Sequence, residues 1–207
     1  MFSVVVIVRN EAKALPGLLQ SLGYVPDLVL CDTGSTDETM KVAGTANAKL
    51  CTFDWCDDFA AARTYAEAHA RYDWIVRVDA DERIKLTGER IFTKWLCRHL
   101  ERAESVGAGQ VFVRRFHGRN DEHWFPRVHR RPWYQWKYPV HERIVPIDDA
   151  WPLSISAEEA TFLHQREIRP RAYHPIFDPK LIHPSLRTHF SKQGLRKGET
   201  TGFPARF

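Results

Sequence analysis

The chain has 207 residues, of which 43% are hydrophobic, and it contains seven tryptophans. A chain of this size can bury one sizeable core, so we expect one compact domain rather than two independent ones. The formal net charge of +4 is unevenly divided. Residues 1–110 hold 13 lysines and arginines against 16 acidic residues, whereas residues 111–207 hold 17 against 10. The basic second half favours an anionic partner there.

No part of the sequence approaches the roughly 18 consecutive uncharged apolar residues that a membrane-spanning helix requires. The apolar stretch at residues 2–8 lacks the basic lead and the long apolar core of a secretion signal. We therefore expect no membrane span and a cytoplasmic location. The four cysteines show no C-x-x-C spacing, which argues against structural zinc.

The first third of the chain alternates between strand and helix patterns. Residues 3–8 form a continuous β-branched, apolar run typical of a strand buried on both faces, and Asn10 is suited to cap the helix that follows. Residues 28–31 repeat the strand pattern. The small polar residues from Asp32 to Asp37 predict a loop whose end caps a second helix.

The alternation continues with a weaker strand over 50–55, a helix beginning near Phe59 and a strand over 74–78. This order predicts an α/β fold with an open, mostly parallel, Rossmann-like sheet flanked by helices. Ligands of such sheets bind beyond the carboxyl ends of the strands, which is where Asp32 and Asp79 fall.

The second half predicts a smaller, mixed β region. A helical pattern over 91–100 precedes three short strand patterns, at 110–116, 126–130 and 142–147. After Pro170 the periodicity fades, and proline, histidine, arginine and lysine dominate. We expect an irregular C-terminal tail there.

The strongest chemical signal is an apolar strand that ends in two carboxylates one residue apart, Asp79 and Asp81. Hard oxygen ligands of this kind suit Mg²⁺ or Mn²⁺. Such an ion can bridge the diphosphate of a nucleotide-sugar and neutralise the charge that grows on the leaving group. The pattern resembles the D-x-D motif of GT-A glycosyltransferases.

The order of several motifs resembles the nucleotide-binding half of family-2 glycosyltransferases over about residues 3–84. The motifs are Val5-Val-Ile-Val-Arg9-Asn10-Glu11, Asp32-Thr-Gly-Ser-Thr-Asp37, Asp58-Phe59 with Arg63, and Asp79-Ala-Asp81-Glu82. The resemblance implies a GT-A fold, a nucleotide-sugar donor, which we expect to be a UDP-sugar, and Mn²⁺ or Mg²⁺ as cofactor.

The same resemblance implies roles for single residues in donor binding. Arg9 and Glu11 would flank the nucleoside pocket, Asp32 would hydrogen-bond a uracil-type base, and Arg63 would approach the diphosphate. The implied donor-binding residues are Val8, Arg9, Glu11, Asp32, Ser35, Arg63, Asp79 and Ala80.

The resemblance also implies the metal ligands. Asp81 would bind the ion, and Asp79 would contact the ion or the ribose. His164 lies where a subgroup of these enzymes has a histidine after an apolar strand, and it would complete the metal shell through its imidazole.

Residues 125–130 and 139–142 are similar to the R-x-F-R and V-H-E segments of that subgroup. An inverting transfer requires a base near the acceptor hydroxyl. Glu142 is the predicted base, with His141 beside it as a second catalytic candidate. Inversion itself is implied by the resemblance alone.

Basic and aromatic residues alternate between positions 114 and 143. Basic groups can meet phosphates, and aromatic rings can stack on bases or on sugar faces, so Arg127, Trp133 and Trp136 are predicted acceptor-binding residues. Two acceptors remain equally favoured: a saccharide of a surface glycan, and a hydroxymethylated pyrimidine in DNA, by analogy with viral DNA-modifying enzymes. A protein side chain ranks behind both.

The resemblance predicts a single GT-A catalytic domain over residues 1–170 and a basic tail over 171–207. Residues 1–105 would bind the nucleotide-sugar and residues 106–170 the acceptor; the oligomeric state stays open. A basic nucleic-acid-binding module with a degenerate GT-A fold is the non-enzymatic alternative. The acidic pair at Asp79 and Asp81 argues against it, because carboxylates beside phosphate require a cation between them.

Overall fold

The computed structural model describes four segments, residues 1–88, 90–116, 122–148 and 152–164. Residues Met1–Glu167 form one compact unit. The predicted tail over 171–207 lies outside the described residues, as does the side chain of His164.

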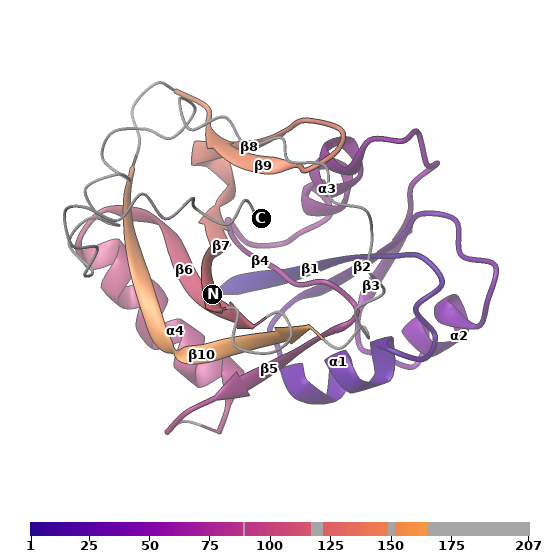
Figure 1. Ribbon diagram of the computed structural model, residues 1–207, viewed down its shortest axis with the longest axis horizontal. Helices are drawn as coiled ribbons and strands as arrows, with labels where there is room; N and C mark the ends of the chain where they lie inside the picture. Colours follow the sequence, from indigo (N-terminus) through magenta and orange to yellow (C-terminus); the bar gives the residue numbers. More distant parts are fainter. Residues whose placement is uncertain (89, 117–121, 149–151, 165–207) are drawn as a thin grey trace, which may run out of the picture. The chain divides into compact units, whose positions relative to one another are not determined.

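Four parallel strands form one side of an eight-stranded sheet, in the order β3-β2-β1-β4 (Figure 1). They are β1 (Phe2–Val8), β2 (Leu28–Asp32), β3 (Lys49–Thr52) and β4 (Trp74–Arg77). The chain returns between them through α1 (Leu15–Leu22), α2 (Thr39–Ala43) and α3 (Phe59–Ala68). The apolar runs of β1 and β2 are buried on both faces, as parallel strands between helices require.

The other side of the sheet is mixed and continues the order as β4-β7-β6-β10-β5. Its strands are β7 (Glu122–Arg130), β6 (Ala108–Phe116), β10 (Leu153–His164) and β5 (Glu82–Leu86). Only β6 and β10 run parallel to each other among these described pairs. A separate antiparallel hairpin consists of β8 (Tyr134–Lys137) and β9 (Arg143–Pro146), after a 3₁₀ turn at Arg131–Trp133.

Helices cover the two faces unequally. Apolar side chains of α1 and α4 (Phe92–Ser105) share the largest buried core with alternate residues of β1. On the opposite face, Ala66 and Ala70 pack with Val5, Val29 and Ile75. The β8–β9 hairpin lies on the α3 side (Figure 1). Its residues Trp136 and Ile144 cluster with Ala60 at the start of that helix.

The structure confirms the predicted α/β class, with a central sheet flanked by helices and a smaller mixed β region. It corrects the predicted helix cap at Asn10, because α1 begins after Ala14. Asn10 has a left-handed φ of 55°, and its Oδ1 accepts a hydrogen bond of 2.8 Å from the Thr36 backbone N–H. Asn10 therefore joins the loops that follow β1 and β2.

Asp37 contributes the carboxylate at the start of α2. Its Oδ1 accepts a 2.9 Å hydrogen bond from the backbone N–H of Thr39, the first residue of that helix. The Thr39 hydroxyl also donates to this carboxylate, and that bond lowers the pKa of Asp37. Its Oδ2 accepts from the Ala12 N–H, so Asp37 fixes the same pair of loops as Asn10.

Gly17 in α1 allows β5 to approach the helix closely. A Cβ at this position would lie 2.4 Å from Nε of Arg83, whose Nη2 donates a 2.8 Å hydrogen bond to the Ala14 carbonyl. We expect Gly17→Ala to displace the guanidinium. Loss of this charge-assisted hydrogen bond lowers the free energy of unfolding by about 1.5–3 kcal/mol. The better helix propensity of alanine offsets roughly 1 kcal/mol of that loss.

Urea unfolding in a double-mutant cycle tests this expectation. Gly17→Ala should destabilise the wild-type protein but stabilise an Arg83→Ala background, in which no side chain blocks the added methyl group. A loss of stability in both backgrounds would contradict this account.

Candidate active site

A cavity of about 420 Å³ opens at the carboxyl edge of the parallel strands. Its lining residues are Ile7, Val8, Arg9, Glu11, Thr33, Trp55, Phe59, Arg63, Asp79, Ala80, Asp81 and Glu142. Most of the residues predicted from sequence for donor binding, metal binding and catalysis are in this set. The lining comes from the end of β1, from the loops after β1, β2, β3 and β4, from α3, and from the loop before β9.

Arg63 lies at the centre of the ionic contacts in the cavity. Its Nε donates to Glu142 Oε1 at 2.8 Å, and its Nη2 donates to Asp79 Oδ1 at 3.1 Å. Burial alone lowers the pKa of this guanidinium, but the two carboxylates outweigh burial and the pKa is raised. Arg63 therefore stays positively charged and joins two segments that are 63 residues apart in the chain.

Arg127 is completely buried beneath the acidic loop, away from the cavity surface. Its two terminal nitrogens each lie 3.3 Å from Asp79 Oδ2, and Nη2 also forms a close ion pair with Glu82. Glu82 in turn accepts a 3.0 Å hydrogen bond from the Asp79 backbone N–H. In this geometry the predicted acceptor-binding residue instead holds the Asp79–Glu82 loop in place.

The buried Trp136 contacts the two arginines that approach Glu142. Two guanidinium groups lie over the Trp136 ring, with Cζ of Arg63 5.2 Å and Cζ of Arg77 5.3 Å from its centroid. Arg77 Nη1 is 3.8 Å from Glu142 Oε1. Burial, together with the charges of two neighbouring arginines, lowers the pKa of Arg77 to about 9.

Trp136 is held by the buried carboxylate of Glu67. Its Nε1–H donates to Glu67 Oε1 at 2.7 Å, and Glu67 Oε2 lies 3.2 Å from His129 Nε2. Only 8% of Trp136 is exposed, and it is not among the residues that line the cavity. Its contacts position the arginines, so its predicted role in acceptor binding stays a prediction.

Asp32 and Ser35 shape the loop after β2 and are not among the lining residues. Both carboxylate oxygens of Asp32 accept hydrogen bonds from the Ser35 N–H, at 3.2 and 3.1 Å. The Ser35 hydroxyl donates to Asp32 at 2.5 Å and accepts from the Asn10 N–H at 3.0 Å. Their predicted contacts with the donor stay predictions.

Two other predicted residues lie outside the lining. His141 is exposed, with a left-handed φ of 59°. Trp133 is half-buried, and Cζ of Arg130 lies 4.7 Å from its ring centroid. The structure brings neither side chain into the cavity, although His141 directly precedes Glu142 in the chain.

The acidic pair suits a metal ion that shares its coordination with a substrate. Asp79 and Asp81 both line the cavity, but the two oxygens of Asp79 are engaged by Arg63 and Arg127. Within the residues that the structure describes, no group of three His, Cys, Asp or Glu side chains could hold a metal ion by itself. Mg²⁺ commonly binds one or two carboxylates plus substrate phosphates, and Asp81 fits that pattern.

Sequence reasoning missed Trp55 and Phe59 as cavity residues. Trp55 lies in the loop that follows β3, as Asp79 lies in the loop that follows β4. The rule that ligands bind beyond strand ends would have found Trp55, had it been applied to β3 as well.

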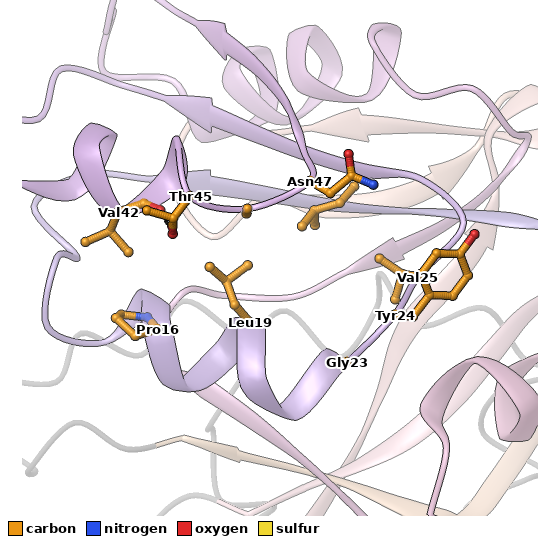
Figure 2. Close-up of a pocket in the computed structure, with 10 residues that line it drawn as sticks. Pro16, Leu19, Gly23, Tyr24, Val25, Val42, Thr45 and Asn47 are labelled. Carbon is orange, nitrogen blue, oxygen red and sulfur yellow. Dashed lines mark hydrogen bonds between the residues drawn. The ribbon is translucent and has the colours of Figure 1, made fainter.

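A second cavity, of about 520 Å³, is lined by residues of α1, of α2 and of the segments that follow these helices. Figure 2 shows Leu19 of α1 facing the segment that follows α2, with Tyr24 and Val25 at one end. Its described lining contains no carboxylate, amine, guanidinium or imidazole group. These lining residues therefore offer no charged side chain to a phosphate or a divalent ion. Among the described residues, no helix is long and apolar enough to span a membrane.

Several relatives match part of the chain. A TPR repeat-containing protein of Synechococcus elongatus is 49% identical over 85 residues, which cover 41% of this chain and 21% of that protein. An uncharacterized glycosyltransferase of Rickettsia bellii is 30% identical over 83 residues, which cover 40% of this chain and 28% of that protein. The matched segments are thus less than a third of each relative.

Solved structures also resemble the chain. The crystal structure of S. aureus TarS 1–349 has a TM-score of 0.48 and 22% identity, and the match covers 58% of this chain and 37% of that one. Glucosyl-3-phosphoglycerate synthase from Mycobacterium tuberculosis, in complex with Mn²⁺, UDP and phosphoglyceric acid, has a TM-score of 0.44 and 24% identity. That match covers 57% of this chain and 44% of the synthase.

The model of the family described as "Glycosyl transferase family 2" matches residues 3–159. This range includes every residue that lines the cavity at the carboxyl edge. Together with the sheet architecture, it confirms the predicted GT-A fold class. The chain belongs to glycosyl transferase family 2.

Proposed function

We propose that this chain transfers a sugar from a UDP-sugar to a hydroxyl group of a saccharide, with inversion and with the help of Mn²⁺ or Mg²⁺. The observation that supports it best is the convergence of Arg63, Asp79, Asp81 and Glu142 in one cavity. These residues come from three separate segments and provide a cation, two carboxylates suited to a metal and a carboxylate suited to a base. Family membership supports the reaction class.

The donor occupies the cavity with its diphosphate near Arg63 and Asp81. Asp81 would hold the metal, which would supply positive charge to the leaving diphosphate. Val8, Arg9, Glu11 and Ala80 line the remaining donor space. Residues 1–105 thus provide most of the donor site, and residues 106–170 contribute Glu142.

Glu142 takes the proton of the acceptor hydroxyl as the acceptor oxygen attacks the anomeric carbon. The bond between that carbon and the β-phosphate oxygen breaks, and the nucleoside diphosphate leaves on the opposite face. Arg63 lies between Glu142 and Asp79, and a bound diphosphate competes with Glu142 for its guanidinium. Donor binding thereby releases the Glu142 carboxylate for proton transfer.

A saccharide acceptor is favoured over DNA because much of the predicted basic surface has partners inside the protein. Arg127 is fully buried, and Arg131 Nη1 donates to the Glu67 and Ala70 carbonyls at 2.6 and 3.2 Å. Beside the cavity, Asp54 and Asp57 are exposed and would repel a polyanion.

Transfer assays with UDP-sugars test this proposal. The protein is incubated with a panel of UDP-sugars and Mn²⁺ or Mg²⁺, in parallel with neutral glycans, hydroxymethylpyrimidine-containing DNA and plain DNA. We expect a sugar-sized mass gain on a glycan and slow, metal-dependent hydrolysis of one donor.

Gain only on the modified DNA would overturn the saccharide acceptor and retain the transferase. Salt-sensitive DNA binding without donor turnover would instead favour the non-catalytic nucleic-acid-binding module.

A further inference from the structure

The active-site cavity has an aromatic end and an acidic end. Because the strand order is β3-β2-β1-β4, the loops that follow these strands lie in the same order along the sheet edge. Trp55 follows β3, Thr33 follows β2, Arg9 follows β1 and Asp81 follows β4, and all four line the cavity. Three strand spacings of about 4.8 Å separate the outer two loops, which gives a trough about 14 Å long.

The acidic end determines how a nucleoside diphosphate would lie in this trough. A divalent ion at Asp81 and the guanidinium of Arg63 both attract phosphates. The nucleoside must then extend along the sheet edge toward β3, because the hairpin residue Glu142 lines the cavity with Arg63 and Asp79 at the β4 end. This orientation places the base beside Trp55 and Arg9.

The Trp55 ring is fixed before any ligand arrives. Its Nε1–H donates a 2.9 Å hydrogen bond to Asp57 Oδ1, and its edge packs against Phe59 with centroids 4.7 Å apart and planes at 68°. Cζ of Arg9 lies 5.9 Å from the Trp55 centroid. A half-buried ring held in this way is a preorganised stacking surface.

Backbone strain occurs beside this surface. Asp57 has a φ of 60° and Asn10, next to Arg9, has a φ of 55°. Asparagine and aspartate tolerate this left-handed region better than most residues, yet the conformation costs free energy and is concentrated at functional sites. Meanwhile Asp32, the base partner implied by family resemblance, is engaged by its own loop.

We propose that Trp55 is the stacking surface for the base of the donor, with the Arg9 guanidinium, which lies over the same ring, as the cation next to the base. The inference rests on the proposed function and adds the group that recognises the nucleoside part of the donor. Stacking uses the flat face that every base has, so Trp55 supplies affinity for the nucleoside with little choice among bases.

Calorimetric titrations with a nucleotide and with pyrophosphate test the proposal. UDP, GDP and inorganic pyrophosphate are titrated in Mn²⁺ into wild-type protein, Trp55→Ala, Trp55→Phe and Tyr24→Ala. Tyr24 is an exposed aromatic residue of the other cavity, so Tyr24→Ala is the matched control. Circular dichroism and thermal unfolding confirm that each variant is folded.

We expect Trp55→Ala to weaken nucleotide binding about 5- to 150-fold and to leave pyrophosphate binding within about twofold of wild type. Trp55→Phe should recover most of the nucleotide affinity, and Tyr24→Ala should change neither. Unchanged nucleotide affinity in Trp55→Ala would overturn the proposal. An equal loss for nucleotide and pyrophosphate would also overturn it, because stacking cannot affect pyrophosphate.

The proposed function has a separate test in the same data. If wild-type protein binds no nucleotide and no pyrophosphate with metal present, the assignment of this cavity as the donor site is wrong, and the stacking proposal is overturned with it. If wild-type protein binds all three ligands and Trp55→Ala is indistinguishable from it, only the stacking proposal fails.

Discussion

Glu142→Gln is expected to lower the rate of sugar transfer by about 100-fold or more, because it removes the group that takes the acceptor's proton. Glutamine has the same shape and keeps an oxygen that can accept the 2.8 Å hydrogen bond from Arg63 Nε. The variant should therefore bind UDP in Mn²⁺ within about threefold of wild type. Transfer rates and calorimetric UDP affinities measure the two effects.

A surface substitution of the same type is the control for Glu142→Gln. Glu38 is exposed and pairs with Lys41 at 2.9 Å, so Glu38→Gln should leave both transfer and UDP affinity unchanged. Retained turnover in Glu142→Gln would place the base elsewhere in the cavity. A parallel loss of turnover and UDP affinity would assign Glu142 to the positioning of Arg63.

The parallel half of the fold could be predicted because its signals are local. The strands β1 and β2 are apolar on both faces, and each is followed by a loop and a helix with regular apolar spacing. The strand β5 gave no such signal, since its sequence Glu-Arg-Ile-Lys-Leu is mostly charged. Glu82 is nevertheless fully buried, because it forms an ion pair with the buried Arg127. Arg127 lies 45 residues later in the chain, so no local pattern around Glu82 indicates this burial.

The same distinction explains what was predicted of the site. Motifs that end strands, such as Asp79 and Asp81, face the cavity because of the topology alone. The location of Arg127 depended on pairings that a single sequence does not reveal. Arg127 lies in an aromatic-rich segment and was interpreted as an acceptor-binding residue, but the carboxylates of Asp79 and Glu82 bind its guanidinium. A buried charge of this kind requires such partners.

Substitution of Asp81 and substitution of Asp79 are expected to affect UDP binding differently: the effect of the first should depend on metal, and that of the second should not. Asp81→Asn should weaken the apparent metal affinity by more than about 100-fold, since even residues that only support a metal ligand alter affinity by about 10- to 100-fold. Asp79 is bound by Arg63 and Arg127, so Asp79→Asn should disturb the arginines with or without metal.

UDP titrations with Mn²⁺ and with EDTA separate these effects. In Mn²⁺, Asp81→Asn should bind UDP only as weakly as the wild type does in EDTA, and adding EDTA should change its affinity no further. Asp79→Asn should lose affinity under both conditions, while Asp148→Asn, at an exposed position, should match wild type. An Asp81→Asn protein that still gains UDP affinity from Mn²⁺ would show that the ion binds elsewhere. Asp79 would then be the carboxylate to test, because a metal ion could replace its arginine partners when the donor binds.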